Sequence, residues 1–361
     1  MTHFLELLRI ATGRRSELSK TPLENEWECL FECAKKQALV GITYAAIERL
    51  PREQRPPRRI LLQWGISASK IKELNVGLNR KVKLILKRFQ HAGFGPSVLK
   101  GQAIAQYYAI DQLDGLRTPG DLDLWLDGSR DEIIDYAHQY NPKCAIVYHH
   151  VDFPRIDGVD VEAHFTPSWM NNYFTNRELQ KFFKRCKREQ FDIARVQDKS
   201  LPMPTLSFNR VYVLVHIYRH LFHTGIGFRQ MLDYYYVLRQ GFSQEERAET
   251  MRILSRLKMK RFAQAAMWVL QYVFGLEDEY LITEPNEKEG RFLLNEILLA
   301  GNFGMSDERM MRTSEDTDFI WGLRKVKRNF RFLWSYPSEV LWSPMFKLWH
   351  YFWRKQYVRS T

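Results

Sequence analysis

The sequence has 361 residues, of which 45% are hydrophobic and 27% charged, a balance typical of globular proteins with two or three domains. No stretch reaches the roughly 18 consecutive apolar residues of a membrane-spanning helix, so we expect no transmembrane segment. The net charge of +12 attracts polyanions such as nucleic acid, nucleotide phosphates or an anionic membrane surface. It does not choose among them, and it is equally compatible with a protein that is merely basic.

Residues 1–92 are predicted to form a helical region. Apolar residues recur there at helical spacing in three stretches, the last of which runs from Ile60 to Phe89. Three prolines, Pro51, Pro56 and Pro57, separate the helices.

Residues 93–205 are predicted to form a small mixed α/β core. A short strand at 97–100 ends at Gly101, and a helix follows at 102–108. Strict alternation of acidic and apolar residues from Asp121 to Leu126 predicts a second strand. Further elements expected in this core are a helix at 131–140, strands at 143–151 and 157–165 joined by a turn at 154–158, and another strand at 191–196.

Residues 206–361 are predicted to be helical again. The segment 301–320 is polar and predicts a loop. The basic, aromatic segment 321–354 is interrupted by Pro337 and Pro344, which favours a last helix docked on the bundle over peripheral contact with a membrane. Helical spacing is found around Leu214 to Leu221 and Met231 to Leu238, and at 244–257, 259–275 and 287–300.

The four cysteines show no pattern of a metal or redox site. Cys29 and Cys33 lie four residues apart on one helix face, a spacing that suits neither zinc nor a redox pair. Together with Cys144 and Cys186 we expect them to be buried, reduced thiols, which fits a reducing compartment. Because the first residues also lack the order of a signal peptide, a cytoplasmic protein is expected.

The predicted core carries acidic residues suited to a divalent metal. Asp121 and Asp123 share one face of a strand, so both carboxylates can reach one or two shared ions. Glu162 on a later strand offers a third carboxylate, with Asp160 on the same face as the reserve candidate. Carboxylates are ligands of Mg²⁺, and phosphoryl transfer depends chiefly on metal ions that bridge phosphates. A lone Asp-x-Asp is nevertheless often a solvated pair, and His164 alone is more typical of a hydrogen-bonded strand residue.

The order of these motifs resembles the uncharacterised nucleotidyltransferase family of bacteria, over about residues 80–240. The segments that carry the resemblance are Val98-Leu99-Lys100-Gly101, Arg117-Thr118-Pro119-Gly120-Asp121-Leu122-Asp123-Leu124, Glu162-Ala163-His164 and Gly227-Phe228-Arg229-Gln230-Met231-Leu232-Asp233, with the helix around His216 to His223.

The resemblance implies a polymerase-beta-like nucleotidyltransferase core, an α+β fold with a small mixed sheet flanked by helical regions. It implies that Asp121 and Asp123 bind Mg²⁺ or Mn²⁺, with Glu162 as the third carboxylate. Gly101 would lie at the turn nearest the triphosphate, and Lys100 would supply a cationic donor. The broader superfamily has Gly-Ser at this turn, where this chain has Gly101-Gln102.

Two arginines have two interpretations each. Arg117 can contact nucleotide phosphate or cap loop carbonyls. Arg229 can form an intrahelical salt bridge with Asp233, the favoured interpretation, or reach phosphate across the active site. Three histidines four and three residues apart share a helix face, and packing or contact with substrate is favoured over metal binding; they are His216, His220 and His223.

The hypothesis favoured by the sequence is a Mg²⁺-dependent nucleotidyltransferase that moves an NMP group from an NTP to an unidentified acceptor. The acceptor can be a small molecule, a sugar phosphate, a protein or RNA. The main alternative is a catalytically inactive nucleotide-binding or interaction module of the same fold. A nucleic-acid-binding protein driven by its positive charge, whose affinity would fall steeply with salt, and a kinase on a related fold are less favoured.

Overall fold

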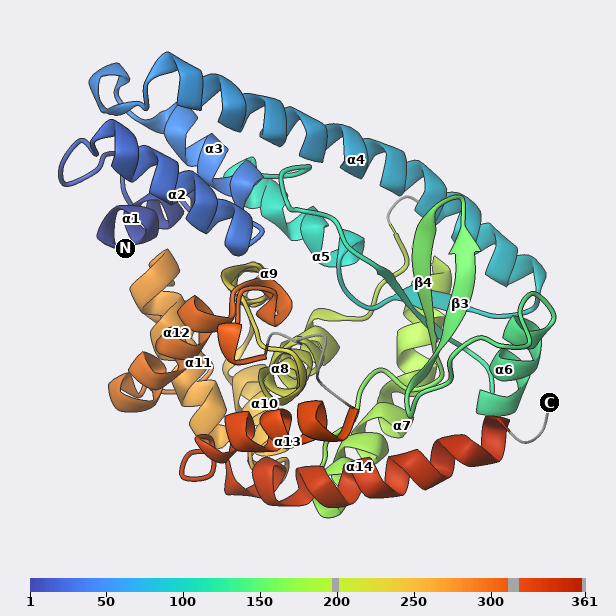
Figure 1. Cartoon of the computed structure of the whole chain (residues 1–361). Helices are drawn as coiled ribbons and strands as arrows, with labels where there is room; N and C mark the ends of the chain where they lie inside the picture. Colours follow the sequence, from blue (N-terminus) through green and yellow to red (C-terminus); the bar gives the residue numbers. More distant parts are fainter. Residues whose placement is uncertain (197–200, 311–317, 359–361) are drawn as a thin grey trace.

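The computed structural model describes residues 1–196, 201–310 and 318–358. Helices surround one four-stranded mixed sheet, which confirms the predicted α+β class (Figure 1). The division of the chain into domains at 92/93 and 205/206 stays a prediction.

The N-terminal region is helical, as predicted. Its four helices are α1 (Thr2–Ala11), α2 (Glu24–Lys36), α3 (Val40–Arg49) and α4 (Arg58–His91). Helix α4 begins directly after Pro57 and has 34 residues. Its first half, with Trp64, packs in the core of the helical region, whereas Val82 and Phe89 in its second half pack against the sheet. Helix α4 therefore fixes the sheet relative to the N-terminal helices (Figure 1).

The sheet has the strand order β1-β2-β4-β3. Its strands are β1 (Pro96–Val98), β2 (Leu122–Leu126), β3 (His150–Ile156) and β4 (Val159–His164). The central strand β2 pairs in parallel with β4 and in antiparallel fashion with β1. This register places Asp123 directly opposite Glu162. Because all five residues of β2 are buried, its position is fixed by packing on both faces.

The strand predicted at 143–151 was placed too early in the chain. Strand β3 starts at His150 and includes Pro154, which the sequence had suggested as part of a turn. Proline fits there because β3 is an edge strand, where a missing N–H need not break the ladder. The turn to β4 lies instead at Asp157 and Gly158, both of which have positive φ angles.

The strand predicted at 191–196 was wrong, because these residues end helix α7 (Tyr173–Val196). Leu179, Phe182 and Phe183 precede Phe191 on the apolar face of this helix, and all four are buried. Helical periodicity over the whole segment therefore outweighs the local strand-like composition. The two short helices of the core are α5 (Gln102–Ala105) and α6 (Arg130–His138).

The C-terminal helices agree with the prediction. They are α8 (Leu206–His223), α9 (Phe228–Leu238), α10 (Gln244–Arg256), α11 (Lys260–Phe274), α12 (Glu287–Ala300), α13 (Asp318–Phe330) and α14 (Pro337–Val358). The segment 301–320, predicted as a loop, contains two short 3-10 helices, η4 (Asn302–Gly304) and η5 (Glu308–Met310), and its last three residues already belong to α13. Residues 311–317 lie outside the described residues. Pro344 does not interrupt the last helix as expected, since α14 continues through it, and Pro337 is its first residue.

The four cysteines are free thiols, but only Cys144 is buried and Cys29 is exposed, so burial was overestimated. Within the described part of the chain, no helix is long and apolar enough to cross a membrane. Helix α14 extends along the opposite side of the molecule from α4 and reaches α6 (Figure 1), where Arg130 lies 5.2 Å from the ring centre of Trp353. The C-terminal segment is therefore docked on the fold.

Candidate active site

Three carboxylates meet at the junction of β2 and β4. Asp123 lies in β2, Asp121 directly precedes this strand, and Glu162 faces Asp123 from β4. One oxygen from each lies within 4.8 Å of the others, so one divalent ion can contact all three. Asp160, the reserve candidate, is exposed and forms an ion pair of 2.5 Å with Arg155. The third member of the cluster is thus Glu162.

Lys100 supplies the positive charge nearest to these carboxylates. Its Nζ lies 2.5 Å from Oδ2 of Asp123 and 3.3 Å from Oδ1 of Asp121. Burial alone would lower the pKa of Lys100, but the charges of Asp123 and Asp121 raise it above its ordinary value. Lys100 is therefore a fully charged ammonium group at the edge of the cluster.

Gly101 lies where the chain turns from Lys100 into α5. Its φ of +64° favours glycine, and a Cβ atom there would lie 3.7 Å from the backbone oxygen of Asp121. The next residue, Gln102, turns away from the carboxylates, because its Nε2 donates to Oδ1 of Asn79 at 2.6 Å and to Oδ1 of Asn75 at 3.2 Å. The residue at the usual serine position is thus part of the contact with α4.

His164 connects two of the carboxylates. Its Nε2 lies 3.1 Å from Oδ1 of Asp123 and 3.2 Å from Oε2 of Glu162. Burial would lower the pKa of His164, but the hydrogen bonds to Asp123 and Glu162 raise it. Burial would likewise raise the pKa of Glu162, yet the hydrogen bond from His164 and the charges of His150, His164 and Lys100 lower it to about 2. Glu162 is therefore ionised across the physiological range.

Sequence reasoning missed two further histidines of this cluster. His150 begins β3, and its Nδ1 lies 3.3 Å from Oε2 of Glu162 and 3.1 Å from Nε2 of His149. With Glu162 and His164 they form a second group whose ligand atoms lie within 4.8 Å of one another. The register of β3 and β4, which pairs His150 with His164, was the signal that could have found them.

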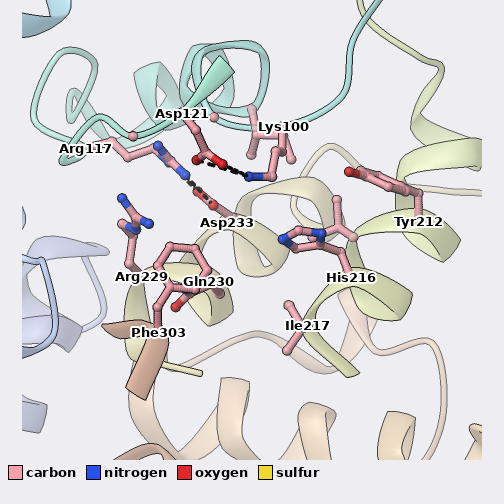
Figure 2. A pocket seen from close by; sticks show the side chains of 14 residues that line it. Lys100, Arg117, Asp121, Tyr212, His216, Ile217, Arg229, Gln230, Asp233 and Phe303 are labelled. Atoms are coloured by element: carbon pink, nitrogen blue, oxygen red, sulfur yellow. Dashed lines mark hydrogen bonds and ion pairs between the residues drawn. The ribbon is translucent and has the colours of Figure 1, made fainter. Parts of the chain in front are cut away.

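Arg117 and Asp233 form a closed ion pair beside the carboxylates (Figure 2). Nε of Arg117 lies 2.7 Å from Oδ1 of Asp233, and Nη2 lies 2.8 Å from Oδ2. The hydroxyl of Tyr108 donates to the same carboxylate at 2.8 Å. Asp233 thus pairs with Arg117 and not with Arg229, contrary to the expected intrahelical salt bridge. Arg229 instead donates to the backbone oxygen of Thr118 at 3.0 Å.

Two hollows flank the carboxylates. The first has Lys100, Gly101, Arg117 and Arg229 in its lining, and the guanidinium group of Arg229 lies above the ring of Phe303 at 5.1 Å (Figure 2). Burial and the charge of Arg117 lower the pKa of Arg229 to about 10, so it stays charged at neutral pH. The structure thus brings all the site residues predicted from the sequence into one region of the molecule.

The second hollow is a cleft of about 850 Å³ on the side of Glu162. The three histidines predicted to share one face of α8 line this cleft: His216, His220 and His223. Burial lowers the pKa of each well below its ordinary value, so all three are neutral at pH 7. Neither candidate metal group among the described residues includes them.

The α+β fold and the acidic cluster agree with what the resemblance implies. The sequence profile of the uncharacterised nucleotidyltransferase family matches residues 24–275, more than half of the chain. The chain therefore belongs to this family, which confirms the resemblance found in its motifs. Comparison with curated proteins and with solved structures found no match. Helices α12, α13 and α14 lie outside the matched residues.

Proposed function

We propose that this protein is a Mg²⁺-dependent nucleotidyltransferase that transfers an NMP group from an NTP to an acceptor hydroxyl. The hydroxyl oxygen forms a bond to the α-phosphorus, the bond from this phosphorus to the bridging oxygen breaks, and pyrophosphate leaves while the hydroxyl proton passes to water. The observation that carries the proposal is the convergence of Asp121, Asp123 and Glu162 beside two hollows.

The donor set fits Mg²⁺ or Mn²⁺, because it consists of three carboxylates on paired strands. Asp121, Asp123 and Glu162 would hold the metal. When bound, the metal polarises phosphoryl oxygens and the attacking hydroxyl. His164 is a positioning residue in this proposal, because its hydrogen bonds fix the orientation of Asp123 and Glu162.

The residues around Gly101 suit the phosphates of the NTP, whose remaining atoms must extend beyond this small hollow of about 20 Å³. Gly101 keeps this edge of the site free of a side chain, and Lys100 can donate to phosphate oxygens from its position beside Asp121. Arg229, which forms no ion pair with a carboxylate among the described residues, provides a second donor. Arg117 also lines this hollow, but its charge is neutralised by Asp233. Its proposed role is therefore to position the loop before Asp121.

Activity is tested by incubating the protein with labelled ATP, GTP, CTP and UTP plus Mg²⁺ and a panel of acceptors. Release of pyrophosphate and a labelled product are expected from the natural chain and not from Asp123→Ala. Asp160→Ala is the matched control, because Asp160 lies on the same face of β4 but outside the cluster. Equal pyrophosphate release from the natural chain and Asp123→Ala would refute the assignment.

One observation favours the inactive alternative. Gln102 stands where the superfamily usually has serine, and its side chain is held by Asn75 and Asn79 away from the carboxylates. A catalytically inactive nucleotide-binding or interaction module would still gain thermal stability from NTP and Mg²⁺ together. Such stabilisation without pyrophosphate release, for any nucleotide and acceptor, distinguishes this alternative from the enzyme.

A further inference from the structure

The carboxylates separate two spaces of different character. Lys100 and Asp121 line both hollows, whereas Gly101 and Arg229 line only the one drawn in Figure 2. Glu162 lines only the larger cleft. If the triphosphate occupies the side of Gly101, the acceptor must approach from the side of Glu162, since in-line attack brings the two reactants from opposite directions.

Five cationic residues line the larger cleft, Lys100 and Arg354 among them. We call the other three the cationic wall: Arg219 of α8, Lys325 of α13 and Lys347 of α14. Arg219 lies 4.1 Å above the ring of Trp169 and contacts Nε2 of His149 at 3.1 Å. Nζ of Lys325 lies 3.3 Å from the ring centre of Trp321. None of the three forms an ion pair with an acidic residue in the part of the chain that the structure describes.

The half-buried positions of the two lysines of the wall are unfavourable for folding, because neither forms an ion pair with an acidic residue among the described residues. Burial lowers the pKa of Lys347 below its ordinary value, and burial together with the charges of Lys347 and Arg328 lowers the pKa of Lys325 to about 8. Removing a charge from water without an opposite charge or hydrogen-bond acceptor weakens the folded state. Residues that break a folding rule in this way are typical of ligand sites, where the ligand supplies the missing charge.

The cationic wall lies partly outside the residues that the family profile matches. Residues that hold the metal in the proposed function all lie within the matched region 24–275. Lys325 of α13 and Lys347 of α14 lie outside it, whereas Arg219 of α8 lies within it. A shared core that handles the nucleotide, together with a separate segment that recognises the acceptor, accounts for this division.

We propose that the larger cleft binds the acceptor, and that the acceptor is a phosphorylated small molecule with a free hydroxyl. This inference rests on the proposed function. The cleft volume of about 850 Å³ lies in the range of roughly 300–1,000 Å³ found for small-molecule sites. Several converging cations suit a phosphate dianion better than a single carboxylate, and Trp169 and Trp321 offer apolar surface for the rest of the molecule.

The test is calorimetric titration of the full chain with inorganic phosphate in the presence of Mg²⁺ and saturating α,β-methylene analogues of ATP, GTP, CTP and UTP. The analogues occupy the triphosphate site without reacting. Phosphate is expected to bind the analogue-loaded protein. The Lys347→Ala substitution is expected to weaken this phosphate binding about tenfold or more. Lys355→Ala is the matched control, because Lys355 lies on the same helix but does not line the cleft.

Two results would overturn the proposal. If the analogues displace phosphate, the cationic wall holds the phosphates of the NTP itself. If acetate binds as tightly as phosphate, the site recognises a carboxylate. Should Lys347→Ala unfold, Lys325→Ala repeats the test on the other helix.

Failure of the proposed function gives a different result from failure of this inference. Asp123→Ala is expected to lose the Mg²⁺-dependent binding of the analogues but to bind phosphate as the natural chain does, because Asp123 does not line the larger cleft. A chain that binds phosphate through Lys347 but never binds the analogues contradicts the nucleotidyltransferase and leaves a phosphate site.

Discussion

Asp123 and Asp233 are both almost fully buried, at 1% and 5% exposure, but their partners differ in kind. The carboxylate of Asp233 is neutralised by a bidentate contact with Arg117 and also accepts a hydrogen bond from the hydroxyl of Tyr108. Asp123 faces a lysine and a histidine that it shares with other carboxylates. Burial of a charge therefore does not itself mark function. The useful distinction is whether the fold neutralises the charge completely or leaves a place for another ion.

The largest effect is expected from Asp123→Asn, which removes one metal ligand but keeps the shape of the side chain. Turnover should fall about 10³-fold, because the metal loses a charged donor where charge develops in the transition state. The free energy of unfolding should change little, since Lys100 keeps its contact with Asp121. Pyrophosphate release and urea unfolding measure the two quantities. A variant that keeps its activity but loses stability would show that Asp123 is a structural charge and not a metal ligand.

Asp233→Asn should show the opposite pattern. It leaves the guanidinium group of Arg117 buried without an opposite charge, which costs about 3–5 kcal/mol in comparable buried pairs. Urea unfolding should show this loss, while the folded fraction keeps its metal affinity. Arg117→Met with Asp233→Leu is the control, because removing both charges should recover most of the lost stability. A double variant as unstable as the single one would contradict this explanation.

The sequence was sufficient to predict the half of the site that depends on local spacing. Alternation in β2 placed Asp121 and Asp123 together, and the same periodicity in β4 identified Glu162. Parallel pairing of these two strands then brings the three side chains into contact. Each of these steps needs only the period of a strand and one correct pairing.

The other half depends on register and on distant pairing, which local patterns do not contain. His150 lay within the strand predicted at 143–151, but the turn expected at 154–158 placed it at the end near the turn, whereas it begins β3 and pairs with His164. Arg117 and Asp233 are 116 residues apart in the chain, so the nearby Arg229 was the only partner that helical spacing could suggest. The cationic wall joins α8 to α13 and α14, and only the folded chain places these helices around one cleft.

A third buried carboxylate is held by backbone N–H groups instead of a cation. Glu339 in α14 accepts hydrogen bonds from the backbone N–H groups of Asn171 at 2.7 Å and Asn172 at 3.4 Å. Burial raises its pKa from 4.5 to about 7, although these hydrogen bonds oppose the shift. Between these pH values the folded chain holds a proton that the unfolded chain has released, so stability falls as the pH rises.

Compared with Glu339→Gln, the natural chain should therefore lose up to about 3 kcal/mol between pH 4.5 and pH 7, and no more above that. Urea unfolding of both proteins across pH 4.5–8.5 measures this difference, and the variant cancels the contribution of all other titrating groups. Parallel curves for the two proteins would show that Glu339 has an ordinary pKa.

The smallest effect concerns Lys100. Its charge partly neutralises the metal-binding carboxylates, which places them between a closed ion pair and an open metal site. Its ammonium group contacts carboxylate oxygens of Asp121 and Asp123, so it competes with a divalent ion for the same oxygens. Lys100→Met should therefore bind Mg²⁺ about tenfold more tightly, because the carboxylates lose their internal counter-charge. The variant should also gain more thermal stability from Mg²⁺ than the natural chain does. Turnover should nevertheless fall, since the donor to the triphosphate is lost. If Mg²⁺ binding weakens instead, Lys100 holds the carboxylates in position for the metal. Lys100 would then be a structural partner of the cluster, as Arg117 is of Asp233.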